Sequence, residues 1–286
     1  MVFENFSPQK KIYFIAEIGI NHNGDIDIAK KLINLAVSCN CDAVKFQKRD
    51  INSVYSKKVL DSFRESPWGN SQRDQKEGLE FSLDQYNEID NFCMQKNIDW
   101  FASCWDIKSQ ILMRKYNFKF NKVASVMATN NDFLERVAEE KKPTFLSTGM
   151  MNLDDIDSAL KVFERNNCEV MLLHTVSTYP AEEEDLNLLC IKTLAEKYNL
   201  PVGYSGHEPS VSPSIIAASL GAGVIERHIT LDRAMYGSDQ AASLQEEGLR
   251  QLISILRKLP KVIGDGQKSF LEKEMPIAKK LRYWEN

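Results

Sequence analysis

Residues 12–47 read IYFIAEIGINHNGDIDIAKKLINLAVSCNCDAVKFQ, and this stretch holds one full instance of the alternation that decides the fold. Two short runs rich in β-branched and aromatic residues, 12–18 and 43–47, enclose a segment of helical period at 26–38. This order is typical of a parallel sheet whose strands are joined by crossover helices. We therefore expect a first βα unit here, with Asp25 as the N-cap of its helix.

The same alternation continues along the chain, and the number of units distinguishes an open sheet from a closed barrel. Six further strands are predicted at 99–103, 119–124, 144–147, 170–174, 201–204 and 223–228. Seven further helices are predicted at 83–95, 107–115, 132–140, 153–164, 186–198, 213–220 and 245–258. Asn131 is the expected N-cap of one helix, and Pro213 lies in the first turn of another. Eight βα units in one run predict an α/β fold, a single-domain (β/α)8 TIM barrel.

Two segments lie outside the alternation. The connection 48–82 is long, polar and without clear periodicity, and we interpret it as a lid or rim element after the second strand. The residues after Gly266 read as a short, charged tail of amphipathic character. We therefore divide the chain into a barrel domain, 1–266, and a C-terminal tail, 267–286.

The composition favours a small-molecule ligand over a macromolecular one. The chain has 286 residues, of which 43% are hydrophobic, so it can bury a substantial core. Its formal net charge of -4 provides no basic surface for nucleic acid, and no run of lysine and arginine suits a membrane surface.

The expected location is the cytoplasm. No segment has the roughly 20 apolar residues that a bilayer span requires. The first apolar run, 12–20, is interrupted by Glu17 and lacks the features of a signal peptide. The six cysteines form no CxxC pair, so we expect reduced, mostly buried thiols.

Polar residues gather where the predicted strands end, which is the face of a TIM barrel that carries active sites. The strand ends read AEIGINHNG at 16–24, KFQKR at 45–49, KVAS at 122–125, STGM at 147–150, HTVSTYP at 174–180, GYSGHE at 203–208 and ERHITLDR at 226–233. All four histidines of the chain fall in these segments: His22, His174, His207 and His228.

His207 and His228 are the candidate metal ligands. Because strand side chains alternate, Glu226 and His228 face the same way, and His207 can meet them from the neighbouring strand. Two imidazoles near carboxylates such as Asp239 suit manganese, cobalt, iron or magnesium. A hydrogen-bonded structural role is the alternative for any single histidine, and we expect it for His174.

Lysines and serines form a candidate anion site. Lys45 and Lys122 end strands that are otherwise apolar, where a charge needs a partner. Hydroxyl and backbone donors lie at further strand ends: Ser125, Ser147 and Ser205. The residues alone leave an alternative open, in which the lysines pair with barrel acids such as Glu17 and the serines cap helices.

Five motifs occur in one order along the chain: IAEIGINHNGD at 15–25, DAVKFQ at 42–47, LSTGM at 146–150, GYSGHE at 203–208 and IERHITLDRAMYGSDQAAS at 225–243. Together they resemble the N-acetylneuraminate (sialic acid) synthase family. The resemblance implies that phosphoenolpyruvate attacks the aldehyde of an N-acetylated amino sugar, N-acetylmannosamine. It implies a divalent metal on His207 and His228, Mn²⁺ first with Mg²⁺ or Co²⁺ as alternatives, and a homodimer.

The resemblance also assigns roles to single residues. The phosphate contacts of the family map onto Lys122, Ser125, Ser147 and Ser205, while Lys45 matches the lysine that approaches the enolpyruvate. The sugar-side positions are Gln47, Tyr179, Asp239 and Ser177, which stands where the family usually has asparagine. The catalytic set is Lys45, Asp239 and two acids, Glu17 and Glu226, either of which can activate water.

Two further departures from the family concern the sugar site. Many members carry a C-terminal antifreeze-like domain that contributes an arginine across a dimer, and we expect none in this chain. The sugar is then held by a separate protein or by the segment after the second strand, which contains Arg49, Arg64 and Arg73. The third strand end reads SCWD at 103–106 instead of the expected proline, phenylalanine and aspartate, so Cys104 and Trp105 reshape that wall.

Several functions remain open at this stage. The nearest competitors are legionaminate and pseudaminate synthases, which act on a 6-deoxy diacetamido sugar. A metal-dependent hydrolase or aldolase on the same barrel is another enzymatic class, because fold alone does not determine function. An inactive regulatory paralogue is the non-enzymatic alternative, which the intact histidines and lysines disfavour.

Overall fold

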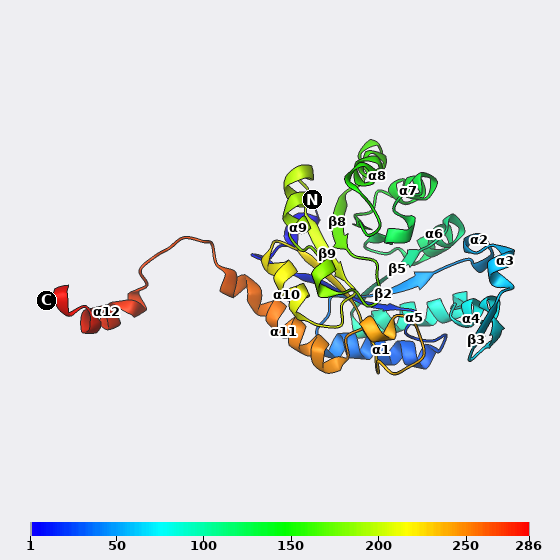
Figure 1. Ribbon diagram of the computed structural model, residues 1–286, viewed down its shortest axis with the longest axis horizontal. Coiled ribbons are helices and arrows are strands. Elements are labelled where there is room, and N and C mark those ends of the chain that lie inside the picture. The colour runs from blue at the N-terminus through cyan, green and yellow to red at the C-terminus, as the bar shows by residue number, and fades with distance from the viewer. Residues whose placement is uncertain (1, 286) are drawn as a thin grey trace.

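The computed structural model describes residues 2–285, and its centre is a closed barrel of eight parallel strands. In barrel order these are β1 (Tyr13–Gly19), β2 (Ala43–Lys48), β5 (Asp99–Cys104), β6 (Asn121–Val123), β7 (Thr144–Ser147), β8 (Val170–Thr175), β9 (Val202–Gly206) and β10 (Val224–His228). The pairing of β10 with β1 closes the barrel and sets Glu17 beside His228. The predicted TIM barrel is confirmed (Figure 1).

Helices between the strands form the outer layer of the barrel (Figure 1). They are α1 (Ile26–Ser38), α5 (Leu83–Lys96), α6 (Ile107–Met113), α7 (Asn131–Ala138), α8 (Leu153–Arg165), α9 (Cys190–Tyr198), α10 (Ser212–Ser219) and α11 (Glu246–Ile263). The side chain of Asp25 accepts hydrogen bonds from two backbone N–H groups of α1, as expected of an N-cap. In α11 the buried residues recur every three or four positions: Leu249, Leu252, Ile253 and Leu256.

Several predicted helix ends were wrong, and three of them have a clear physical reason or a large displacement. Helix α7 is capped by Asn130 and not by Asn131, because the Asn130 side chain is the one that accepts the N–H of Phe133. The helix predicted at 186–198 begins only at Cys190, since Asn187 has a left-handed backbone that a helix cannot include. Helix α11 continues past 258 to Ile263.

The connection after β2 is structured, in contrast to the aperiodic stretch that its composition suggested. Residues 49–81, called the rim segment below, contain α2 (Ile51–Val54), α3 (Lys57–Leu60), a hairpin of β3 (Phe63–Ser66) and β4 (Gly69–Ser71), and α4 (Gln72–Gly78). The ring of Trp68 occupies the place where a Cβ at Gly78 would lie and packs edge-on against Tyr236, 5.6 Å away. The rim segment therefore reaches across to the loop that follows β10.

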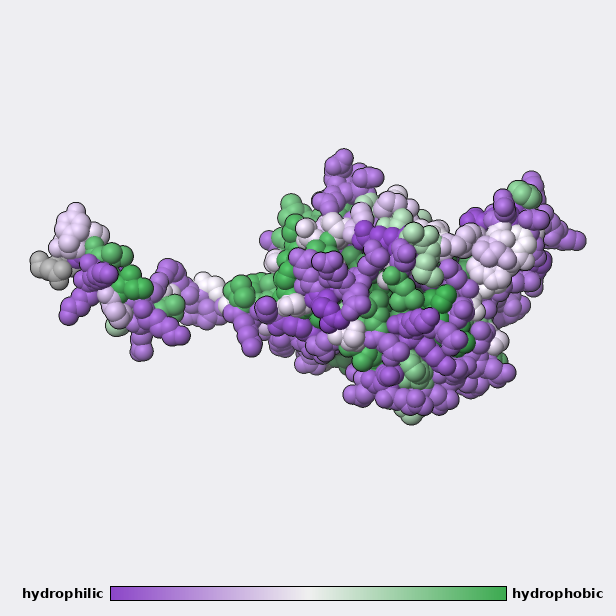
Figure 2. Space-filling model, turned by 90° about the horizontal axis from the view of Figure 1, so that it is seen from below, coloured by the Kyte–Doolittle hydropathy of each residue, from purple (hydrophilic) through white to green (hydrophobic). Residues whose placement is uncertain are grey.

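The chain beyond α11 runs away from the barrel. Gly264 and Gly266 have positive φ, which ends the helix, and the chain then reaches α12 (Met275–Leu281). Figures 1 and 2 show this part as a separate arm, at the opposite end of the molecule from the rim segment. The division of the chain at 266 stays a prediction.

All six cysteines are free thiols, and four of them are buried: Cys39, Cys93, Cys104 and Cys168. Within residues 2–285 no helix combines the length and the apolar character that a bilayer crossing demands.

Candidate active site at the carboxyl ends of the strands

Four charged side chains from β1, β2, β6 and β10 form a buried network inside the barrel. Lys45 Nζ lies 2.8 Å from Glu17 Oε2 and 3.5 Å from Glu226 Oε1. Lys122 Nζ lies 3.3 Å from the same oxygen of Glu226. All four residues are at most 4% exposed, so each charge depends on the others. The pairing of lysines with barrel acids, which the sequence left open, is present in the structure.

The network changes the proton affinity of its members. Burial lowers the pKa of Lys122 to about 8, helped by the charge of Lys45 and opposed by Glu226. Burial also disfavours a charged Lys45, but Glu17 and Glu226 outweigh it and raise the pKa of that amine. Glu226 stays ionised because Lys122 and Lys45 lower its pKa despite burial. Lys122 is thus the member that loses its proton most readily near neutral pH.

Hydroxyl groups surround the network, as the sequence predicted. Ser205 Oγ donates to Glu226 Oε1 at 3.2 Å. Ser103, which the sequence did not single out, accepts from Lys45 Nζ at 3.4 Å. The hydroxyl of Ser147 is buried and has no partner among the described residues. A buried hydroxyl without a partner is unfavourable, so this atom marks a place for a polar ligand.

A small cradle lies at the ends of β6, β7 and β8. The N–H of Gly149 donates to Ser125 Oγ at 3.1 Å. A Cβ added to Gly149 would lie 2.1 Å from Ser177 Oγ and 2.7 Å from Ser125 Oγ, so no larger residue fits. Glycine backbone and serine hydroxyls at strand ends are the groups that hold phosphate. Ser177, predicted to contact the sugar, lies on this side of the site beside Ser125.

His207 and His228 lie together at the ends of β9 and β10. Their ring centroids are 5.5 Å apart, and the ring of Tyr179 lies 4.1 Å from that of His207 and 5.8 Å from that of His228. His207 Nδ1 lies 2.6 Å from the carbonyl oxygen of Val176, which assigns the proton to Nδ1 and leaves Nε2 for a ligand. Asp239 Oδ2 is 3.8 Å from His228 Nδ1.

These histidines fit a divalent cation as two ligands of an incomplete set. Among the described residues, His228 Nδ1 is buried and has no hydrogen-bond partner. Burial, together with the charge of His228, lowers the pKa of His207 to about 3, so His207 is neutral and able to bind a metal. The part of the chain that the structure describes has no group of three or more His, Cys, Asp or Glu placed to hold an ion. Water or substrate would supply the remaining ligands.

Gly19 allows the network and the histidine pair to meet. It has φ +55, and a Cβ there would lie 3.1 Å from Glu17 Oε1, 3.2 Å from Gln47 Nε2 and 3.3 Å from His228 Cε1. Gln47 Nε2 also donates to Glu17 Oε1 at 3.3 Å. The predicted sugar contact Gln47 therefore lies between a network acid and a candidate metal ligand.

The other two histidines have structural contacts. His174 Nε2 lies 2.7 Å from the carbonyl oxygen of Leu186, in agreement with a structural role. His22 Nδ1 accepts the N–H of Gly24 at 3.0 Å, and its ring stacks on Phe81 at 3.9 Å. Neither ring is placed beside the pair of His207 and His228.

A second buried charge pair, Arg227 with Glu208, lies next to the two histidines in the sequence and faces away from the barrel mouth. The sequence did not reveal this pair. Arg227 Nη1 lies 2.9 Å from Glu208 Oε1 and donates to Ser214 Oγ at 2.8 Å, while the Tyr204 hydroxyl donates to Glu208 Oε2 at 2.7 Å. Alternation along β10 indicates that Arg227 faces away from the mouth, but nothing local identifies Glu208 as its partner. Since Glu208 follows His207 and Arg227 precedes His228, the pair ties both backbones together.

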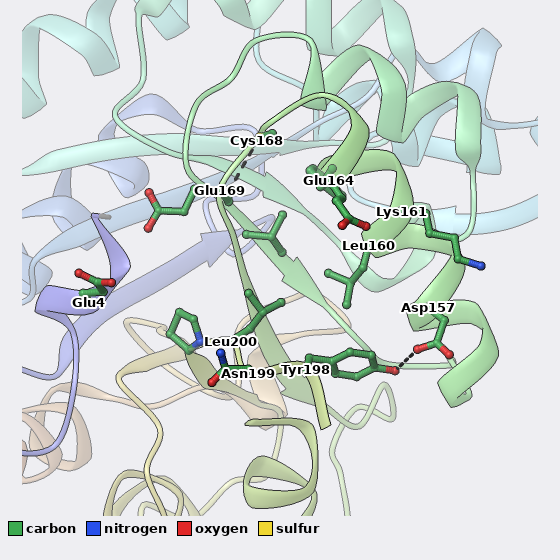
Figure 3. A pocket seen from close by; sticks show the side chains of 13 residues that line it. Glu4, Asp157, Leu160, Lys161, Glu164, Cys168, Glu169, Tyr198, Asn199 and Leu200 are labelled. Atoms are coloured by element: carbon green, nitrogen blue, oxygen red, sulfur yellow. Dashed lines mark hydrogen bonds between the residues drawn. The ribbon is translucent and has the colours of Figure 1, made fainter. Parts of the chain in front are cut away.

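An apolar cavity of about 550 Å³ lies elsewhere, at the amino ends of β8 and β9 (Figure 3). Leu160, Val170 and Leu200 line it, and Tyr198 hydrogen-bonds to Asp157 at its edge. None of the predicted site residues lines this cavity. The candidate active site is therefore at the opposite end of the barrel from it.

Comparison with known proteins identifies relatives over nearly the whole chain. A model described as the NeuB family matches residues 32–268. Human N-acetylneuraminate-9-phosphate synthase is 36% identical over 96% of this chain and 77% of its own. N,N'-diacetyllegionaminic acid synthase from Campylobacter jejuni is 36% identical over 93% and 81%. The solved N-acetylneuraminic acid synthetase of Leptospira borgpetersenii, in complex with citrate, is 28% identical and superimposes with a TM-score of 0.84 over 96% of this chain and 94% of that one.

Proposed function

The chain belongs to the NeuB family, and from this premise we propose that it condenses phosphoenolpyruvate with an N-acetylated amino-sugar aldehyde and water, giving a nonulosonic acid and phosphate. Relatives named as sialic acid and legionaminic acid synthases support an enzyme of sialic acid synthase type. The observation that carries the proposal is the proximity of a buried lysine network to a histidine pair, with Glu17, Gln47 and His228 all around Gly19.

The donor requires a site for two anionic groups, a phosphate and a carboxylate. The Gly149 cradle and the unpartnered hydroxyl of Ser147 suit the phosphate. Lys45 and Lys122 bring two positive charges to the same barrel interior. On binding, part of their pairing with Glu17 and Glu226 is exchanged for charge-assisted hydrogen bonds to the donor.

The acceptor would bind above the donor, with its aldehyde beside the histidine pair. His207 and His228 would hold a divalent cation, Mn²⁺ first with Mg²⁺ or Co²⁺ as alternatives, and such an ion supplies Lewis acidity to a carbonyl oxygen. Gln47, Tyr179 and Asp239 lie around the pair and offer an amide, a hydroxyl and a carboxylate to sugar hydroxyls.

The chemistry balances with the groups present. The electron pair of the enol double bond forms the new carbon–carbon bond, and the aldehyde oxygen takes up one proton of the water that is added. The donor carbon that bears phosphate becomes electron-poor and is attacked by water, whose proton passes to a carboxylate, Glu17 or Glu226. The carbon–oxygen bond to phosphate then breaks, the second proton of that water leaves with the phosphate, and a keto acid is formed. The ionised state of Glu226, held by two lysines, suits it to stabilise positive charge.

The names of the relatives are compatible with two types of acceptor sugar. The human relative is named for a product that carries a phosphate on carbon 9. Phosphoenolpyruvate supplies carbons 1 to 3 of such a product. Carbon 9 therefore corresponds to carbon 6 of the acceptor sugar, which is where the phosphate was. The legionaminic acid synthase instead names a diacetamido product. A homodimer and a cytoplasmic location stay predictions.

The test is a condensation assay. Purified protein is incubated with Mn²⁺, phosphoenolpyruvate and N-acetylmannosamine, its 6-phosphate or a 6-deoxy diacetamido sugar, and phosphate and keto acid are measured together. We expect equimolar products that depend on the sugar and disappear with EDTA. Failure of every sugar to stimulate phosphate release would remove the proposal.

A further inference from the structure

The two candidate metal ligands are held in the fold in different ways. His228 is the last residue of β10, lies beside Glu17 of β1 in the barrel, and its carbonyl oxygen accepts the N–H of Leu244 at 2.8 Å. His207 belongs to no strand within residues 2–285, because β9 ends one residue earlier, at Gly206. The separation of the two imidazoles therefore depends on what fixes the chain after Gly206.

The direct contacts of His207 come from another loop. Its carbonyl oxygen accepts the N–H of Ala181 at 3.1 Å, and its Nδ1 lies 2.6 Å from the carbonyl oxygen of Val176. Both partners belong to the segment after β8. These contacts orient the ring, but they do not connect it to β10 and to His228.

Arg227 makes that connection. It immediately precedes His228 in β10, has no exposed surface, and its Nη1 lies 2.9 Å from Glu208 Oε1. The same nitrogen donates to the carbonyl oxygen of Ser210 at 2.9 Å and to Ser214 Oγ at 2.8 Å, while Nη2 donates to the carbonyl oxygen of Glu208. One guanidinium thus binds the backbone after β9 at two carbonyl groups.

The carboxylate of Glu208 is also fixed from the side of β9. It has no exposed surface, and the Tyr204 hydroxyl donates to its Oε2 at 2.7 Å. A Cβ added to Gly206 would lie 2.6 Å from Glu208 Oε2 and 2.6 Å from the ring of Tyr204, so the carboxylate folds back against the glycine. The chain on both sides of His207 is therefore tied to the residue before His228.

We propose that Arg227 and Glu208 are positioning residues, which set the separation of His207 from His228 and thereby the affinity of the site for a divalent cation. The inference rests on the proposed function and adds residues to its metal site. Bonds from imidazole nitrogen to such a cation are about 2 Å long and tolerate displacements of only about 0.2 Å. Groups behind metal ligands commonly change metal affinity by about 10- to 100-fold.

The experiment measures the Kd for Mn²⁺ by titration calorimetry. The double variant Arg227→Met/Glu208→Gln removes both charges, so that neither is left buried without its partner, and keeps an acceptor for Tyr204. Its Kd for Mn²⁺ should rise by about 10- to 100-fold. Tyr204→Phe is a milder change that removes one hydrogen bond to Glu208, and it should raise the Kd by about 3-fold.

A second ligand separates positioning from a general disturbance of the mouth. The affinity for phosphoenolpyruvate, measured without metal, should stay within about 2-fold of the wild type in both variants, because Lys45 and Lys122 are on other strands. If it falls as far as the affinity for Mn²⁺, the pair supports the whole mouth and the assignment is overturned.

A matched arginine at the other end of the barrel is the control. Arg257 of α11 pairs with Asp42 at 2.6 Å and donates to the carbonyl oxygen of Ile12 at 2.6 Å. Arg257→Met loses contacts of the same kinds and should keep the wild-type Kd for Mn²⁺. Circular dichroism and thermal unfolding establish that each variant is folded at the temperature of the titration. An equal loss of Mn²⁺ affinity in Arg257→Met would assign the effect to lowered stability and overturn the inference.

The same titrations distinguish this inference from the proposed function. A wild-type Kd in the double variant would overturn the positioning role alone and leave the metal site and the condensation as they are. A wild-type protein that binds none of Mn²⁺, Mg²⁺ and Co²⁺ would remove the proposed metal site, and the positioning role with it.

Discussion

The two ends of the barrel are built from the same eight strands but differ in chemistry. At the amino ends, the rings of Phe3, Phe6, Tyr13, Phe120 and Phe145 pack together with centroids 4.7 to 6.5 Å apart. We call these five residues the floor. At the carboxyl ends lie paired charges, the pair of His207 and His228, and buried polar atoms that have no partner among the described residues. The floor consists of apolar rings that satisfy one another, while the mouth has the buried polar groups that a ligand would bind, so we expect stability and function to separate along the barrel axis.

The largest expected effect is at the mouth. His228→Ala should abolish Mn²⁺ binding in calorimetry and lower kcat by about 1000-fold or more, because it removes one of two candidate protein ligands. The thermal midpoint should change little, since His228 Nδ1 forms no hydrogen bond within residues 2–285 that the substitution would remove. His174→Asn is the control and should retain Mn²⁺ binding, because His174 contacts Leu186 and not the pair. Normal Mn²⁺ binding by His228→Ala would contradict the metal site.

The converse substitution tests the floor. Phe120→Ala should lower the free energy of unfolding by about 3–5 kcal/mol, because Phe120 is fully buried and its ring packs against those of Phe3 and Phe145. At temperatures well below the thermal midpoint of the variant, its kcat/KM should stay close to that of the wild type. Phe63→Ala is the control, since that ring is 77% exposed and should contribute less than about 0.5 kcal/mol. A large loss of kcat/KM in folded Phe120→Ala would mean that the two ends are coupled.

A pair of glycines sharpens the comparison. Gly149→Ala should raise KM for phosphoenolpyruvate by about 10- to 100-fold, because its Cβ would fill the cradle beside Ser125 and Ser177. Gly248→Ala, in α11, finds only ordinary contacts at 3.6 Å and should stabilise the protein by about 0.5–1 kcal/mol without changing KM. Urea unfolding and steady-state kinetics on both variants measure the two effects. An unchanged KM in Gly149→Ala would exclude the cradle as the phosphate site.

The smallest effect is in the pH dependence of the mouth. Below its lowered pKa of about 8, Lys122 is protonated and its positive charge attracts the anionic donor. Above this pH the amine becomes neutral. The value of kcat/KM for phosphoenolpyruvate should therefore fall as pH rises, by about 10-fold per pH unit above that point. Lys122→Gln should be weakly active at every pH and should lack this fall. If kcat/KM of Lys122→Gln falls with rising pH in the same way as that of the wild type, the titrating group is not Lys122.

Much of the mouth could be predicted because strand ends converge in a barrel. Lys45, Lys122, His207 and His228 were all expected at the mouth from strand position alone, and the structure brings them there. Whether they bind metal and phosphoenolpyruvate stays a prediction. The pairing of Arg227 with Glu208 could not be predicted, since it joins the outer face of β10 to the loop after β9, beside Ser214 of α10.

The rim segment was the least predictable part of the site. The position of α4 had no sequence signal, because nothing local indicates that the hairpin beside it contacts the loop after β10. Trp68 decides that arrangement by filling the space above Gly78 and contacting Tyr236, far along the chain. The sequence made Arg49 a candidate for the sugar site. Only the folded protein shows that its Nη2 is buried and has no hydrogen-bond partner among the described residues.

The sequence by itself determined the barrel, the faces of its strands and the residue types at its mouth, because periodicity and strand ends are local properties of a chain. Only the tertiary structure decided which charges pair, which donors remain without acceptors and where the rim segment lies. These depend on the register that closes β10 against β1 and on packing between segments far apart in the sequence, neither of which leaves a local pattern.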